Sequence, residues 1–172
     1  GRLSYEQRNF DITDWPDSIG DLFSGRSLRG GGQPLRISAA PGQVFENYQL
    51  SLSDPSLNDA FIGGSSGASV GRRRFDEFSD NTTTLGAGLS RRFGARWTAQ
   101  TNVQWQNIRL FDLEPSSTTE AFSFEGTNQL TRIGGAIRRT TVPPAERFRP
   151  TRGSITGIGV EQIGVLGGDF DY

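Results

Sequence analysis

The chain has 172 residues, with 18 basic and 19 acidic side chains and a formal net charge of −1. It contains no Cys, His or Met, which excludes disulfides, thiol chemistry, the usual zinc sites and histidine general-base catalysis. A charge near zero provides no global field to recruit nucleic acid. No apolar run approaches the ~20 residues of a membrane helix, so a barrel is the only membrane-spanning option. We therefore expect neither an enzyme nor a bound cofactor or metal.

Residues 3–12 predict a first strand, and residues 14–25 predict a short helix with Asp14 as its N-cap. The helix would cap the mouth of a barrel or dip its apolar face into a membrane leaflet. The run Gly30-Gly31-Gly32 lacks the strand and helix context of a phosphate loop, so we expect a turn there and no nucleotide site.

From residue 33 onward the chain predicts a meander of antiparallel strands, because short alternating runs are separated by turn residues. Together with the first strand, these strands predict an all-β, up-and-down sheet of about eight strands. The expected strands after the first cover residues 33–39, 47–53, 63–75, 82–93, 97–106, 128–140 and 156–161.

The clearest strand is residues 97–106 (WTAQTNVQWQ), where apolar and polar side chains alternate strictly. Since side chains alternate across a strand, its two faces meet different surroundings. The apolar face carries Trp97, Val103 and Trp105. The polar face carries Gln100, Asn102 and Gln104. The tryptophans lie eight residues apart, which projects to roughly 20 Å for a strand tilted by ~40°, close to the ~25 Å apolar band of outer-membrane barrels.

Two architectures produce such alternation, a soluble sheet protein and a membrane barrel. The second face is rich in amides, serine, glycine and arginine on nearly every strand, which suits a water-filled lumen better than a sandwich exterior. We therefore expect a transmembrane barrel, whole or in part, with lipid against Trp97, Val103 and Trp105. The expected lumen lining is Gln100, Asn102, Gln104, Arg132 and Arg138. A tight turn at 92–97 and looser connections at 76–81 and 110–127 fit short turns on one side and long loops on the other.

Three turn motifs strengthen this prediction. Gln7-Arg8-Asn9-Phe10 resembles a Q-x-N-[FW] motif, and Ser53-Asp54-Pro55-Ser56-Leu57 resembles a [TE]-[NED]-P-x-[FL] turn. Arg149-Pro150-Thr151-Arg152-Gly153 resembles an F-P-T-x-G turn. Each is ordinary turn chemistry by itself, but their order and spacing are similar to the outer-membrane β-barrel assembly and translocation superfamily that includes BamA, Sam and Toc proteins. The motif residues are Gln7, Asn9, Phe10, Asp54, Pro55, Arg149, Pro150, Thr151 and Gly153.

The resemblance implies that residues 1–172 are one piece of a single barrel domain, matching barrel strands two to nine, with no POTRA domain in the chain. It implies a non-enzymatic factor of the bacterial outer membrane that inserts β-barrel proteins or secretes a passenger. Its partners would be outer-membrane lipids, nascent outer-membrane proteins and accessory assembly lipoproteins. The connections 11–34, 54–62, 94–96 and 141–153 would be periplasmic. The connections 40–45, 76–82 and 110–127 would lie outside the cell.

Two other functions stay open. A porin or ligand-uptake channel would use lumen arginines, for example Arg36, Arg92, Arg132 and Arg138, to favour anions, unless carboxylates such as Glu161 pair with them. A soluble β-rich binding module is the other alternative. Calcium binding at Asp76-Glu77 or at Asp169 and Asp171 is a further alternative, because these paired acids lie at expected loop positions. The run Arg72-Arg73-Arg74 lacks interleaved stacking aromatics, so it predicts a solvated strand end and no nucleic-acid site.

Overall fold

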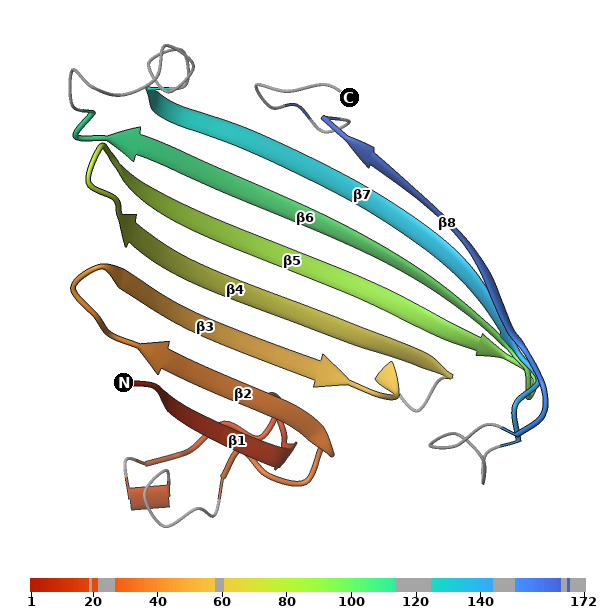
Figure 1. Ribbon diagram of the computed structural model, residues 1–172. Helices are drawn as coiled ribbons and strands as arrows, with labels where there is room; N and C mark the ends of the chain where they lie inside the picture. The colour runs from red at the N-terminus through yellow and green to blue at the C-terminus, as the bar shows by residue number, and fades with distance from the viewer. Residues whose placement is uncertain are drawn as a thin grey trace.

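The computed structural model describes residues 1–18, 20–21, 27–57, 61–113, 125–143, 151–164 and 167. They form one antiparallel sheet of eight strands, in the spatial order β1 to β8 (Figure 1). Each strand pairs with its neighbours in sequence, as the predicted meander requires. The strands are β1 (Leu3–Phe10), β2 (Gln33–Ala40), β3 (Phe45–Asp54), β4 (Ile62–Arg74), β5 (Ser79–Phe93), β6 (Trp97–Phe111), β7 (Gly126–Thr140) and β8 (Ile155–Ile163).

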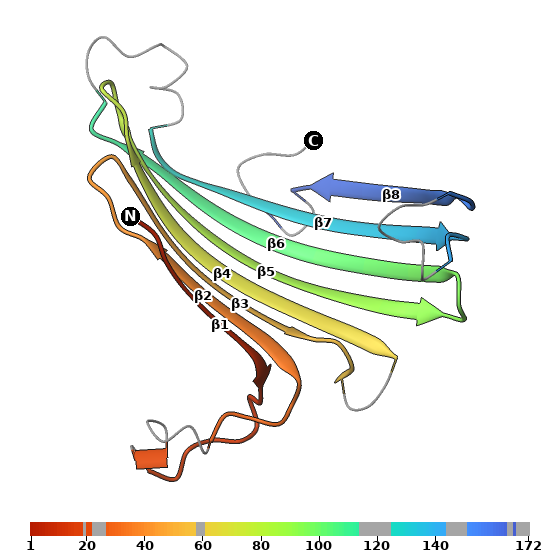
Figure 2. The same cartoon turned by 60° about the horizontal axis from the view of Figure 1, so that its bottom comes forward.

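The sheet is open. Strands β1 and β8 occupy its opposite edges, and the sheet bends into an arc whose edges do not meet (Figure 2). The all-β prediction is confirmed, and of its two forms, the arc matches part of a barrel wall and not a small closed barrel. Curvature of this kind follows from the twist and stagger of neighbouring strands.

The described residues form a single layer without an apolar core. None of their hydrophobic side chains is buried, whereas a soluble sandwich hides one face of each sheet against the other. Leu50, Leu85 and Leu89 are each about half exposed. This surface therefore needs apolar surroundings that the described sheet itself does not supply.

The central strands are longer than the sequence predicted. β5 begins at Ser79 and β6 continues to Phe111, so the loose connection expected at 76–81 is wrong. Residues 75–78 make a tight turn instead, in which the Phe75 amide donates to the Phe78 carbonyl over 2.8 Å. The polar start of β5 carries no apolar alternation, which is why its sequence resembles a loop.

The connections fall at two ends of the sheet, grouped as predicted. One end holds 11–32, 55–61, 94–96 and 141–154. The other end holds 41–44, 75–78 and 112–125. Each end has a short turn, for example 94–96 and 75–78, and each has a long connection. The expected division into a short-turn side and a long-loop side is therefore wrong.

Of the predicted helix at 14–25, residues 14–18, 20 and 21 are described, and among these only Gly20 and Asp21 are helical. Asp14 is not its N-cap, because the Asp14 carboxylate and carbonyl accept hydrogen bonds from the backbone of Arg29 and Leu28. The Ser18 hydroxyl takes the capping position, accepting a hydrogen bond from the Asp21 amide at 3.2 Å. No helix in the described part of the chain has the length and apolar character needed to cross a membrane.

Candidate membrane-facing and lumen-facing surfaces

The strand register assembles one continuous apolar face. Residues directly opposite each other in an antiparallel pair point to the same side. Val103 of β6 lies opposite Ala87 of β5 and Ile133 of β7, so these three side chains form a row across the sheet. Along β5, exposed Leu85, Ala87 and Leu89 alternate with half-buried glycines. The apolar face comprises Leu3, Tyr5, Leu35, Ile37, Tyr48, Leu50, Leu52, Ala68, Val70, Leu85, Ala87, Leu89, Trp97, Val103, Trp105, Ile133, Ile137, Ile158 and Val160.

Aromatic rings lie toward both ends of this face. Trp97, 46% exposed, is opposite Phe93, and the Arg139 guanidinium lies 5.8 Å from the Trp97 ring. Trp105 shares the face and lies opposite Leu85. At the end that holds turn 75–78, the Phe75 and Phe78 rings stand 4.7 Å apart. Aromatic belts of this kind flank the apolar band of membrane barrels.

The opposite face of the sheet is polar, and most of its residues near the amides have small side chains. Asn102 lies in a row with Gly88 of β5 and Gly134 of β7. A Cβ atom on Gly134 would sit 2.7 Å from the Asn102 Oδ1 atom, so glycine makes room for the amide. Gln100 lies opposite Ser90 and Ala136, and Gln104 lies opposite Gly86 and Arg132. The register thus places the predicted amides on one surface, and every residue opposite them except Arg132 is small.

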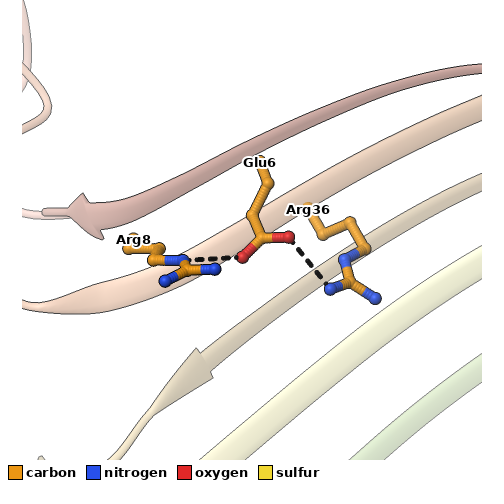
Figure 3. A network of polar contacts seen from close by, with 3 residues as sticks. All are labelled: Glu6, Arg8 and Arg36. Carbon is orange, nitrogen blue, oxygen red and sulfur yellow. Dashed lines mark hydrogen bonds and ion pairs between the residues drawn. The ribbon is translucent and has the colours of Figure 1, made fainter.

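The arginines of the polar face differ in their partners. Arg36 Nη2 lies 3.0 Å from Glu6 Oε2, and Glu6 Oε1 accepts from Arg8 Nε at 3.0 Å (Figure 3). Arg132 Nε lies 3.2 Å from Glu161 Oε1, an ion pair without hydrogen-bond geometry. The Arg132 and Glu161 pairing fits the alternative in which lumen carboxylates neutralise the arginines. The pairs are partly exposed, so each contributes little stability.

Arg92 and Arg138 lie on the same polar face, in one row on either side of Thr98. Neither forms an ion pair with any residue that the structure describes. Together with Gln100 and Thr140 they border a cavity of about 630 Å³. This corner of the polar face therefore carries positive charge that is not neutralised by a described carboxylate.

The first turn motif holds connection 11–32 against β1 through side-chain hydrogen bonds. Gln7 Nε2 donates to the Leu28 carbonyl at 3.1 Å, and Asn9 Oδ1 accepts from the Gly32 amide at 3.0 Å. Both contacts fasten the end of connection 11–32 to β1. Phe10 pairs with Gln33 beyond a shift in the register. The motif residues therefore fix how the chain returns from this connection into β2.

Gln33 joins the first motif region to the second, and the sequence analysis missed it. Its side chain accepts from the Ile12 amide at 3.1 Å and donates to Asp54 Oδ2 at 2.9 Å. It is only 8% exposed. Asp54 Oδ1 also accepts from the Ser56 amide at 2.8 Å, closing the turn in which Pro55 lies. A polar residue beside Pro34 at a strand start was the only signal in the sequence.

Leu57, the last position of the second motif, covers a glycine. A Cβ atom on Gly64 would lie 2.9 Å from Leu57 Cδ1. An apolar residue at the end of the motif thus packs against the start of strand β4, which explains why the pattern has an apolar residue there.

The third motif is only partly described, since Arg149 and Pro150 lie outside the described residues. Gly153 has φ = 93°, and a Cβ atom there would meet the Thr141 backbone at 2.8 Å. The Thr141 hydroxyl accepts from the Ser154 amide at 2.7 Å. Thr151 follows Pro150 in the same connection. Glycine is therefore required at the last motif position.

Connection 11–32 reaches the apolar face. Trp15 and Leu28 border a cavity of about 470 Å³ together with Leu35, Leu50 and Leu52. The Asp11 carboxylate accepts from the hydroxyl and the amide of Thr13, and these hydrogen bonds hold the Asp11 pKa below its usual range. Trp15 thus adjoins the surface predicted to meet lipid, as expected if the segment dips into a leaflet.

No group of His, Cys, Asp or Glu side chains suited to a metal ion occurs within the described ranges, which include Asp76 and Glu77. Asp169 and Asp171 lie outside those ranges.

The open sheet, its apolar face with aromatic ends and its polar face define the wall of a transmembrane β-barrel. A model of the Omp85 superfamily domain matches residues 27–172, and the chain belongs to this superfamily. Membership agrees with the resemblance predicted from the turn motifs and supports a role in membrane-protein insertion or transport. A search of curated proteins finds no match.

Proposed function

We propose that this chain forms part of the wall of a BamA-like barrel that inserts β-barrel proteins into the bacterial outer membrane. The observation that carries the proposal is the continuous apolar face across eight strands, in a chain of the Omp85 superfamily. In this proposal residues 1–172 belong to a single barrel domain and correspond to its strands two to nine. The partners are outer-membrane lipids, nascent outer-membrane proteins and accessory assembly lipoproteins.

The described residues contribute the surroundings in which insertion takes place. The apolar face contacts the lipid chains of the bilayer. The polar face, with Gln100, Asn102 and Gln104, lines a water-filled lumen. A wet interior lets a nascent strand keep its backbone groups hydrogen bonded until it pairs with a strand edge. The network around Gln33 and Asp54 stiffens the end of the wall that we place in the periplasm.

Reconstitution tests this proposal. The full-length protein is placed in phospholipid vesicles, and the folding rate of a urea-unfolded outer-membrane β-barrel protein is followed by protection from added protease. We expect faster folding than in protein-free vesicles and in vesicles that hold an unrelated barrel. Equal rates in all three preparations would contradict an insertion role.

An anion channel is the second candidate, and a specific observation favours it. Arg92 and Arg138 border a cavity on the polar face and pair with no carboxylate among the described residues. A channel would lose anion selectivity in planar bilayers when Arg92 and Arg138 are replaced by Gln. The matched control is Arg36→Gln, since Glu6 already neutralises Arg36. Selectivity that does not change in the double variant would exclude this candidate.

A further inference from the structure

Arginines gather where β5 ends, β6 begins and β7 ends. All of them are exposed, and the described residues of this corner, 90–99 and 136–143, contain no Asp or Glu. The five residues are Arg91, Arg92, Arg96, Arg138 and Arg139. The other end of the same strands mixes arginines with acids such as Asp76 and Asp80. In their described residues, these three strands are therefore strongly basic at one end only.

The register divides this arginine corner between the two faces. Arg139 is opposite Trp97, and Arg91 is opposite Ala99, so both belong to the apolar face. Arg92 and Arg138, their neighbours in sequence, belong to the polar face. The positive charges of Arg91 and Arg139 thus lie at the edge of the apolar face, which we place against lipid.

Both rim arginines lie against aromatic rings. The Arg91 guanidinium is 5.2 Å from the Phe93 ring centre, and the Arg139 guanidinium is 5.8 Å from that of Trp97. Neither forms an ion pair within the described part of the chain. Long basic side chains at a membrane rim run along apolar surface and place their charge at the headgroups. A planar guanidinium binds phosphate through two parallel hydrogen bonds.

We propose that Arg91 and Arg139, with Phe93 and Trp97, form a binding site for the phosphate headgroups of anionic glycerophospholipids at this rim. The inference rests on the proposed membrane placement. The site is continuous with the apolar face, so the acyl chains of a bound lipid run along Ala99 and Ile137, which lie in one row with Arg91 and one row farther into the apolar face than Arg139. Two arginines on alternate strands stand roughly 10 Å apart across the sheet, so each engages its own headgroup.

Lipid binding to the full-length protein in detergent micelles tests the site. Phosphatidylglycerol and phosphatidylcholine are titrated separately, and bound lipids are counted by native mass spectrometry. We expect tighter binding of phosphatidylglycerol, and a loss of about fivefold for each arginine removed by Arg91→Gln and Arg139→Gln. The matched control, Arg92→Gln with Arg138→Gln, removes the same charge from the same corner on the polar face and should keep the preference.

Three results would overturn the inference. They are an equal loss in both double variants, an unchanged preference in the Arg91 and Arg139 variant, and tighter binding of lipopolysaccharide than of phosphatidylglycerol at this rim. Membrane insertion of each variant is measured in parallel. Failure of every variant and of the parent chain to insert would defeat the membrane placement itself, whereas normal insertion without the lipid preference would defeat the headgroup site alone.

Discussion

An arginine in place of Val103 should destabilise the inserted barrel, because it puts a charge where the wall meets lipid. Val103 is 39% exposed and lies in a row with Ala87 and Ile133. It is six residues from Trp97 and two from Trp105, which amounts to about 15 Å and about 5 Å along the membrane normal for a tilted strand, so it lies inside the apolar band but nearer to Trp105. Arginine on a barrel's lipid face costs about 2–4 kcal/mol at the midplane and about 0–1 kcal/mol near the interfaces, so we expect about 1–3 kcal/mol here, or roughly a 5- to 150-fold shift in the folding equilibrium.

The assay is reversible urea unfolding of the protein in phospholipid vesicles, followed by tryptophan fluorescence. The matched control is Asn102→Arg, which adds the same charge one residue away on the polar face, next to Gly134. We expect the control to lose far less stability and Asn102→Ala to be tolerated. Equal losses for the two arginine variants, or a larger loss at Asn102, would refute the assignment of the faces.

Three further predictions concern packing and turns, each measured by the same unfolding assay. Gly134→Ala should cost about 1–3 kcal/mol by crowding Asn102, and Asn102→Ala should restore most of it; a loss that Asn102→Ala leaves unchanged would count against this contact. Gln33→Leu should cost about 1–3 kcal/mol because Asp54 and a backbone amide lose their partner, and an unchanged stability would disprove the bridging role. Gly153→Ala should destabilise through its positive φ and its contact with the backbone, while Gly94→Ala, with positive φ but open space, should cost less.

Much of the fold follows from period-two alternation. The order of hydrophobic and polar residues in 97–106 assigns the two faces of β6, and pairing to its neighbours extends the assignment across the sheet. The start of β5 and the end of β6 could not be predicted this way. Residues 79–84 are polar on both faces, so their strand structure depends on pairing with β4 and β6 and not on a local pattern.

The sequence predicted only some of the residues in the hydrogen-bond network around Gln33 and Asp54. The turn motifs identified Gln7, Asn9 and Asp54, but Gln33, whose side chain links Asp54 to the Ile12 amide, is 21 positions from both in sequence. Such a contact depends on the register of three strands. The capping pattern predicted a helix at 14–25 with Asp14 as its N-cap. In the structure Asp14 instead accepts hydrogen bonds from the backbone amides of Arg29 and Leu28. Long-range contacts of this kind override local signals.

Single-cysteine scanning of residues 97–106 tests the two-faced wall most directly, since the chain has no native cysteine. Each variant is inserted into lipid vesicles and treated with a water-soluble thiol reagent that does not cross membranes. We expect labelling with period two, high at positions of the polar face such as 100, 102 and 104, and low at 99, 101 and 103. Uniform labelling along the strand would contradict a wall that separates lipid from water.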